Sequence, residues 1–232
     1  MWLGSFHLGN CFALYVGESG SNETHSHATY QLIICESGTV EVFDEFNEVL
    51  EARAILINPM TPHSIRSQSI LKILYLEPQS DLTFRLLKHT TQKRISSFDL
   101  NCLEIEPHWS SEEIIQALRL LAPKPSSNID RRILRAMQLL NEHPGSHSIA
   151  DVAKQSGLSE SRLRTIAREQ LKVPLATWHL WCKLQASINT LQRRESLIDA
   201  AAIGGFADQA HFSRTMRQMF GITPTTAIKA IR

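Results

Sequence analysis

Two stretches near the C-terminus repeat the same pattern, and this duplication constrains the fold more than any other feature of the chain. Residues 149–171 and residues 197–220 each read as a short Ala-rich amphipathic segment, a turn centred on glycine, and a second amphipathic segment that carries arginines. The turn glycines are Gly157 in the first copy, and Gly204 and Gly205 in the second. Each copy therefore predicts a helix-turn-helix, whose second helix can lie in the major groove of DNA.

A long helix is predicted between the two copies. Pro174 suits the first turn of a helix, because its missing N–H has no partner there. From Pro174 to Arg193, apolar residues recur in steps of three and four, which indicates one buried stripe. Twenty residues span about 30 Å, close to the roughly 34 Å of one turn of B-DNA. This length would place the second helices of the two copies, the reading heads, in successive major grooves. The alternative interpretation is that the segment is an ordinary core helix of an all-α domain. The stripe consists of Leu175, Trp178, Trp181, Leu184, Ile188 and Leu191.

The second copy carries a specific sequence motif. It reads A-A-x-x-G-F-x-D-Q-x-H-F-S-R from Ala201 to Arg214, followed by F-G-x-T-P from Phe220 to Pro224. With this motif, the block 129–232 resembles the DNA-binding domain of AraC/XylS-type transcription regulators. The resemblance implies two helix-turn-helix subdomains joined by one helix.

The departures from the family pattern cluster in the first copy. Ala167 stands where an aromatic residue usually packs, and Lys172 replaces the usual turn glycine. Lys183 replaces the usual arginine of the linker helix, and Met216 fills a typical Phe position in the second copy. Lys172 is therefore expected to adopt the left-handed backbone conformation that glycine adopts at lower cost.

The same resemblance and the helical spacing together assign residues to DNA. Leu163, Ile166 and Ala167 face the core of the first copy by their spacing, so the residues between them are exposed. Arg164 is expected to read a guanine through its bidentate fork, worth about 1–3 kcal/mol of discrimination. Arg162 and Arg168 are expected to hold phosphates, which positions the protein without specifying sequence. The predicted DNA-binding residues are Ser161, Arg162, Arg164, Thr165 and Arg168 in the first copy, and Gln209, Ala210, His211, Ser213, Arg214 and Arg217 in the second. Gln209 suits adenine, and Arg217 suits a backbone contact; a solvated surface role is the alternative for any single residue.

The charge distribution supports this assignment. The whole chain has a net charge of only +1. Residues 1–127 hold 9 Lys and Arg against 15 Asp and Glu, a net charge of −6, whereas residues 128–232 hold 15 against 8, a net charge of +7. The basic half can neutralise phosphates, and the acidic half is expected to stay off the DNA.

The N-terminal half is predicted to be a different kind of domain. Between residues 28 and 77, short β-branched and aliphatic runs alternate with turn residues, which indicates a small β-barrel or sandwich. Residues 78–90 and 110–122 then become helical, the latter after the capping box S-x-x-E that starts at Ser110. The predicted fold class is α+β with two domains: a small cupin-like β-barrel with following helices, and an all-α domain. The expected boundaries are 1–122 for the first domain, 123–128 for a linker and 129–232 for the DNA-binding domain.

One histidine pattern in this half is similar to the two metal-binding motifs of cupin barrels. His25 and His27 precede Gln31 and Gly38, and a P-x-x-P-H run ends later at His63. Two histidines at i and i+2 on a strand project to the same face, and His63 can come from a neighbouring strand. Three imidazoles suit Zn, Fe, Ni or Cu, although Gln31 stands where a carboxylate ligand is usual. The four residues His25, His27, Gln31 and His63 are therefore candidates for a divalent metal (Zn, Ni or Fe) or for a small-molecule effector. A metal-free barrel with satisfied polar groups is the third interpretation.

Several protein classes are disfavoured by what the sequence lacks. The four cysteines lie far apart without a C-x-x-C pattern, which argues against a zinc finger or a disulfide framework and suits reduced cytoplasm. No apolar run approaches the length of a membrane span, and the first residues carry no basic leader, so a membrane location is not expected. Phosphate-binding, nucleophile-elbow and dinucleotide-binding glycine motifs are also absent.

Taken together, these patterns predict a soluble, sequence-specific transcription regulator of bacterial type, not an enzyme. The N-terminal domain senses a small molecule or metal, and residues 78–122 help to form a homodimer. The C-terminal domain binds double-stranded promoter DNA, with RNA polymerase as a further partner if the protein activates transcription. Effector binding is expected to change the orientation or the dimer spacing of the DNA-binding domains.

Two other classes of function are compatible with parts of the sequence. A metal-dependent cupin enzyme with an appended helical domain is disfavoured by Gln31 and by the lack of an acid/base partner. A DNA-independent module that uses the helical half to dock another protein would bind its partner without sensitivity to salt.

Overall fold

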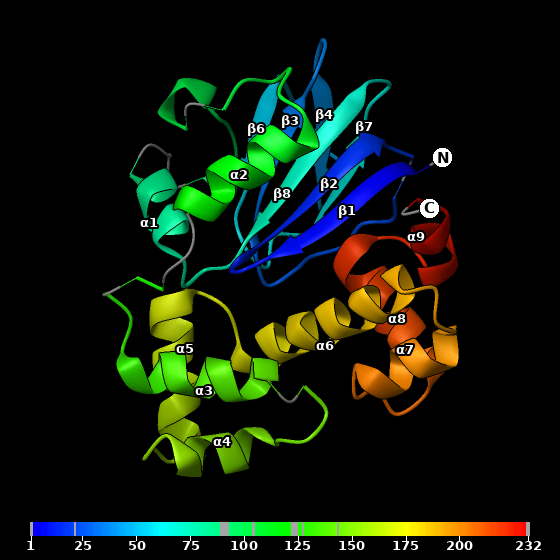
Figure 1. Ribbon diagram of the computed structural model, residues 1–232. Coiled ribbons are helices and arrows are strands. Elements are labelled where there is room, and N and C mark those ends of the chain that lie inside the picture. Colours follow the sequence, from blue (N-terminus) through cyan, green and yellow to red (C-terminus); the bar gives the residue numbers. More distant parts are fainter. Residues whose placement is uncertain are drawn as a thin grey trace.

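The computed structural model describes residues 2–20, 22–88, 93–103, 105–121, 125–126, 128–142 and 144–230. Its N-terminal half contains two antiparallel sheets, with strand orders β1-β2-β8-β3-β6-β9 and β5-β4-β7 (Figure 1). The strands are β1 Leu3–Gly9, β2 Phe12–Glu18, β3 Tyr30–Cys35, β4 Val40–Asp44, β5 Val49–Ala52, β6 Ala54–Ile57, β7 His63–Arg66, β8 Ile70–Leu76 and β9 Ile95–Ser97.

Side-chain alternation divides the larger sheet into two buried faces. Ile33 of β3 and Ile73 of β8 belong to the apolar cluster that includes residues of the smaller sheet, such as Val42. Leu32 and Leu74, one position along each strand, belong to a second cluster. Because successive side chains of a strand point to opposite faces, a continuous apolar run such as β3 is buried on both sides.

Two helices cover the second face of this sheet. They are α1 (Asp81–Leu87) and α2 (Ser111–Leu121), with the 3-10 helix η1 (Leu100–Cys102) between them. Leu82 of α1 and Ile114 and Leu118 of α2 pack into the second cluster. The predicted capping box opens α2: Ser110 Oγ accepts from the N–H of Glu113, whose carboxylate accepts from the N–H of Ser110. Both predicted helices of this half are therefore present.

The C-terminal half is helical throughout its regular elements (Figure 1). The helices are α3 Arg131–Glu142, α4 Ile149–Gln155, α5 Glu160–Leu171, α6 Leu175–Gln192, α7 Leu197–Ile203, α8 Gln209–Phe220 and α9 Pro224–Ala230. Helices α4 and α5 form the first predicted helix-turn-helix, α7 and α8 form the second, and α6 joins them. The predicted α+β class with two domains is confirmed. No helix of the described ranges has both the length and the apolar character needed to cross a membrane.

The two halves share one apolar core rather than meeting only through the linker. Tyr75 of β8 packs against Trp181 of α6 and Phe220 of α8, with ring centroids 5.8 and 5.4 Å apart. The proposed linker lies partly outside the described residues. Within its described part, the N–H of Ser126 donates to the carbonyl of Gln79 at 2.7 Å. The two domains therefore contact each other well beyond the linker, because long-range packing brings β8 onto α6.

A buried carboxylate strengthens the same junction. Glu77, just after β8, accepts hydrogen bonds from Trp181 Nε1 at 3.1 Å and from Gln185 Nε2 at 3.2 Å, both on α6. Gln79 Nε2 donates to its second oxygen. Burial raises the pKa of Glu77, and the three donors oppose that rise. These bonds hold the end of β8 against the middle of α6.

Candidate functional site

The two helix-turn-helix units begin and turn by the same local chemistry. Their first helices, α4 and α7, each start with a capping box, formed by Ser148 with Asp151 and by Ser196 with Asp199. The S-x-x-D pattern that encodes both boxes is visible in the sequence but did not enter the prediction. The second helices also start at side-chain caps: Ser159 caps α5 and Asp208 caps α8.

The residues that directly follow α5 and α8 also correspond. Lys172, after α5, has φ 59° and ψ 17°, and Gly221, after α8, has φ 68° and ψ 10°. Both are left-handed, so the expectation for Lys172 is confirmed. A left-handed residue costs about 1–2 kcal/mol when it is not glycine, and the first unit tolerates that cost.

Helix α5 presents the predicted DNA-binding residues on its exposed face. Its buried side chains are those of Leu163, Ile166, Ala167 and Leu171. The predicted DNA-binding residues Ser161, Arg162, Arg164, Thr165 and Arg168 are all exposed. Arg164 Nη2 lies 2.6 Å from Glu160 Oε1, so the guanidinium expected to read a base is held by an exposed i, i+4 ion pair. Such a pair is worth about 0.3–0.5 kcal/mol, far less than a bidentate base contact, and DNA can displace it.

Helix α8 presents a less open face. Of its predicted DNA-binding residues, Gln209, Ala210, Arg214 and Arg217 are exposed, whereas His211 and Ser213 are half-buried. The His211 ring packs edge-on against Phe206, with centroids 5.2 Å apart. Arg217 was predicted to contact the DNA backbone. In the structure its Nε lies 3.6 Å from Glu23 Oε1 of the N-terminal domain.

The spacing between the two units is held by more than α6. This helix has 18 residues, which span about 27 Å, slightly less than predicted. Lys183 Nζ donates to the carbonyl of Gly205 at 2.8 Å, and His179 Nε2 donates to the carbonyl of Pro144 at 2.6 Å. A Cβ on Gly205 would meet the backbone of Gly145, so the turn of the second unit touches the loop between α3 and α4 directly. These contacts make the two units and α6 one body, which sequence reasoning did not reveal.

The N-terminal domain brings the three predicted histidines together. His25, His27 and His63 are buried, and their candidate ligand atoms all lie within 4.8 Å of one another. His63 begins β7, so it comes from another strand as predicted, but β7 pairs with β4 in the smaller sheet and is not a neighbour of β3. His25 and His27, however, precede β3 instead of lying on it, and His25 pairs with His63 in an isolated β-bridge. Gln31 lies on β3, with its side-chain amide 2.8 Å from His27 Nε2.

Backbone carbonyls determine the tautomers of two of these three rings. The Nδ1 atoms of His25, His27 and His63 face the carbonyl oxygens of Glu23, Thr29 and Thr61 at 3.0, 2.9 and 2.9 Å. A carbonyl oxygen only accepts, so Nδ1 of His25 and Nδ1 of His63 carry the hydrogen, and the Nε2 atoms of these two rings keep a lone pair. His27 differs, because its Nε2 lies 2.8 Å from Gln31 Oε1, which only accepts, and its Nδ1 lies 3.2 Å from the Thr29 hydroxyl, which can donate. Among the described residues, Nε2 of His25 and Nε2 of His63 have no hydrogen-bond partner. Burial and the neighbouring rings lower the pKa of His25 to about 3 and lower that of His63 as well, so both rings are neutral.

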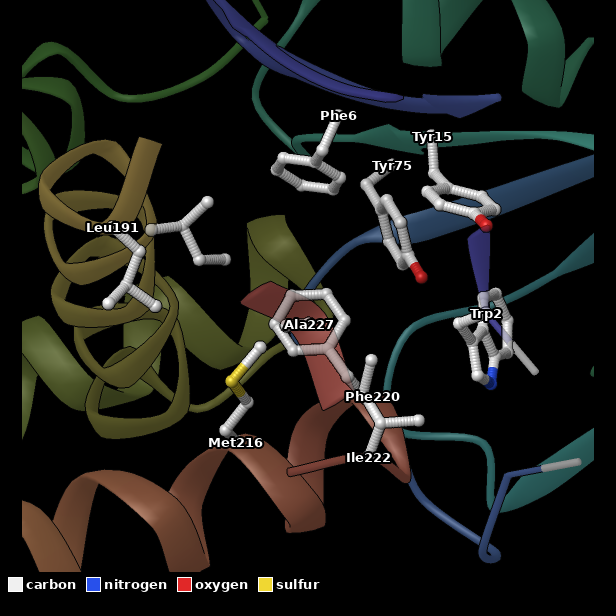
Figure 2. A pocket seen from close by; sticks show the side chains of 10 residues that line it. Trp2, Phe6, Tyr15, Tyr75, Leu191, Met216, Phe220, Ile222 and Ala227 are labelled. Atoms are coloured by element: carbon white, nitrogen blue, oxygen red, sulfur yellow. The ribbon is translucent and has the colours of Figure 1, made fainter. Parts of the chain in front are cut away.

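A small apolar cavity of about 50 Å³ lies between the two domains. Figure 2 shows aromatic side chains of the N-terminal domain, such as Tyr75, on one side, and side chains of the helical domain, such as Met216, on the other. The lining residues are Trp2, Phe6, Tyr15, Tyr75, Ile188, Leu191, Met216, Phe220, Ile222 and Ala227. Sequence reasoning missed this cavity because its walls come from elements far apart in the chain.

Comparisons with known proteins agree with this architecture. Residues 14–163 match the family model described as the AraC-like ligand binding domain, and residues 152–230 match a helix-turn-helix domain. The arabinose operon regulatory protein of Escherichia coli is 30% identical over 100 residues, which cover 42% of this chain and 34% of that protein. Its counterpart from Salmonella typhimurium is 32% identical over 100 residues, 42% of this chain and 36% of that protein. The match thus spans about a third of the length of these curated relatives.

Solved structures show the same fold across both domains. The crystal structure of ToxT from Vibrio cholerae has a TM-score of 0.60 at 14% identity, covering 95% of this chain and 98% of that chain. A crystal structure of wild-type ToxT bound to an unsaturated fatty acid has a TM-score of 0.57 at 13% identity, covering 94% and 95%. At these identities, the likeness concerns the fold.

Proposed function

The chain belongs to the AraC family of transcription regulators, and on this premise we propose that it binds promoter DNA sequence-specifically under the control of an effector in its N-terminal domain. The observation that carries the proposal is the pair of arginine-bearing reading helices, α5 and α8, held on one body by α6. The family consists of transcription factors, which argues against a metal-dependent cupin enzyme. Action in the cytoplasm as a homodimer through residues 78–122, and contact with RNA polymerase if it activates, belong to the same proposal.

The DNA-binding part of the proposal predicts two different effects of two arginine variants. Arg164→Ala is expected to relax preference at one base pair by about 1–3 kcal/mol, because a base-reading fork is lost. Arg168→Ala is expected to weaken binding to all duplexes alike, because a phosphate contact is lost. The slope of log affinity against log salt concentration should fall by about one. Fluorescence anisotropy on duplexes selected from a random pool, at several salt concentrations, measures both effects.

Lys154→Ala is the matched control for these variants. It removes an exposed positive charge from α4, outside the reading helices. It should therefore leave base preference unchanged and alter affinity less than Arg168→Ala does. Equal, sequence-independent losses in Arg164→Ala and Arg168→Ala would contradict the assignment of Arg164 to base reading.

One candidate effector site is the apolar cavity between the domains. A volume of about 50 Å³ holds little more than a water-sized group, whereas ligand pockets usually measure about 300–1,000 Å³. An apolar chain would therefore have to separate Tyr75 and Phe220 as it entered. Ligand binding here would then compete with docking of the two domains. The ligand would therefore bind the docked and the undocked arrangements with different affinities, which is what regulation requires. The fatty acid bound to ToxT supports an apolar ligand of this kind for the present chain.

Oleic acid is the probe for this cavity. We expect it to quench or shift intrinsic tryptophan fluorescence, because Trp2 lines the cavity. Ala227→Val adds two methyl groups to the lining and should weaken oleic acid binding about tenfold, at roughly 0.8 kcal/mol per methylene-sized group. Ala176→Val, at an exposed position of α6, is the control. Unchanged binding in Ala227→Val would place the ligand elsewhere.

The histidine cluster is the second candidate effector site, for a divalent metal such as Zn, Ni or Fe. The Nε2 lone pairs of His25 and His63 converge in it, and the opposite Nδ1–H of each ring is held by a carbonyl. His27 would join them with its hydrogen on Nδ1, which faces the carbonyl of Thr29. This is the arrangement that orients metal-bound imidazoles in proteins. His25, His27 and His63 would hold the ion, which would bring a positive charge into a neutral buried site. The side-chain oxygen of Gln31 would be a neutral fourth ligand.

A further inference from the structure

The segment that carries two of the clustered histidines also caps the second reading helix. The N–H of Glu23 donates to the carbonyl of Gly221 at 3.0 Å, and the N–H of Ser26 donates to the carbonyl of Gln218 at 3.1 Å. The last carbonyls of a helix have no partner inside the helix and need one from outside. For α8 that partner is the N-terminal domain, and we call residues 22–27 the capping segment.

The glycine at the end of α8 is explained by this docking rather than by backbone conformation alone. Lys172 occupies the matching left-handed position at the end of α5 without being glycine. A Cβ on Gly221 would meet the carbonyl oxygen of Glu23 and the side chain of Asn22 at close range. Gly221 is therefore needed because the capping segment lies directly on it, and Gly221→Ala should push the two apart.

Three further contacts connect the histidine cluster and the capping segment to α8. The His27 ring meets Tyr75 edge-on at 5.4 Å, and Tyr75 in turn meets Phe220, the last residue of α8, at 5.4 Å. Glu23 also faces Arg217 of α8 across 3.6 Å. The cluster thus reaches the reading helix through both the backbone of the capping segment and an aromatic contact.

We propose that a divalent metal ion bound by His25, His27 and His63 locks α8 against the N-terminal domain through the capping segment, and thereby lowers DNA affinity. This inference rests on the proposed function. Four-coordinate zinc sits about 2.0–2.1 Å from each imidazole nitrogen, so ligand atoms up to 4.8 Å apart must draw closer around the ion. That contraction fixes the capping segment. In the locked arrangement, Glu23 competes with phosphate for Arg217, and the second reading head cannot reorient towards DNA.

The test compares the full-length protein with two glycine variants, with and without zinc chloride. Gly221→Ala breaks the docking, whereas Gly157→Ala is its matched control: both glycines have φ +68°, but a Cβ on Gly157 meets nothing within 4 Å. Calorimetry measures zinc binding, hydrogen exchange measures protection of α8, and anisotropy measures DNA affinity. In the unmodified protein and in Gly157→Ala, zinc should slow exchange in α8 and lower DNA affinity about 5- to 150-fold, the usual range of allosteric coupling. In Gly221→Ala, zinc should still bind, but both responses should largely disappear.

Glu23→Ala gives a second variant in case Gly221→Ala does not fold. Its side chain is exposed, and its removal should raise the DNA affinity of the zinc-loaded protein. Failure of zinc to bind the unmodified protein, an unchanged α8 exchange rate in its presence, or a full zinc response in Gly221→Ala would each overturn the inference. Absence of DNA binding in every state would instead contradict the proposed function, and the exchange data would still decide whether the cluster controls α8.

Discussion

Replacement of Trp181 by alanine is expected to lower the free energy of unfolding by about 3–5 kcal/mol. Trp181 is fully buried, and its ring lies 5.8 Å from both Tyr75 and Phe220. Its Nε1–H donates to the buried carboxylate of Glu77. The variant therefore leaves a large cavity in the shared core and removes one of the hydrogen-bond donors to a buried carboxyl group. Urea denaturation, followed by circular dichroism and by fluorescence, measures the change.

Trp181→Phe separates the two contributions to this loss. It keeps most of the ring packing but removes the hydrogen bond to Glu77, so it should cost about 1–3 kcal/mol. If the shared core makes the two domains unfold together, the unmodified protein should show one transition, and Trp181→Ala should separate it into two. A loss below 1 kcal/mol in Trp181→Ala, with a single transition retained, would contradict the role given to this side chain.

The helical domain could be predicted from sequence in most of its detail because its signals are local. The stripe of apolar residues from Leu175 to Leu191 is set by the helical repeat, and all six of its members are buried. The caps at Ser159 and Asp208 depend on residues only a few positions away. Each helix therefore carries its own boundaries in its sequence.

The histidine cluster was predicted in its membership but not in its local structure. The spacing of His25, His27 and His63 indicated a shared site, and the structure brings the three together. The placement of His25 and His27 on a strand was wrong, because the β-bridge between His25 and His63 depends on partners far apart in the chain. The carbonyls that hold each Nδ1 likewise have no sequence signature, since any residue can supply them.

The junction between the domains could not be predicted, because it depends on pairs of residues distant in sequence. Glu77 reads as an ordinary polar residue after a strand, and only the folded chain places it under Trp181 and Gln185. The contact between Gly145 and Gly205 is of the same kind. Both are tertiary contacts that local propensity and periodicity do not report. They are also the contacts that determine how the reading heads are oriented.

The second large effect concerns the DNA rather than the protein. We expect that inserting five base pairs between the two half-sites of a selected duplex lowers affinity on the order of 10²- to 10⁴-fold. B-DNA turns once in about 10–10.5 base pairs, so this insertion moves the second major groove to the opposite face. A flexible linker could follow the groove. The body formed by α6 with the contacts of His179 and Lys183 cannot, so the advantage of binding both half-sites is lost.

An insertion of ten base pairs tests the rigidity of the spacer directly. It returns the groove to the original face but moves it about 34 Å along the axis, which is more than the full length of α6, about 27 Å. If α6 and its contacts hold the two units rigidly, DNA affinity should stay low for both the five-pair and the ten-pair duplex. If the two units are connected flexibly, affinity should recover in the ten-pair duplex. Anisotropy with the original, five-pair and ten-pair duplexes at one salt concentration measures the difference. Recovery of more than half of the lost binding free energy at ten base pairs would show that the two units move independently, against the contact of Gly145 with Gly205.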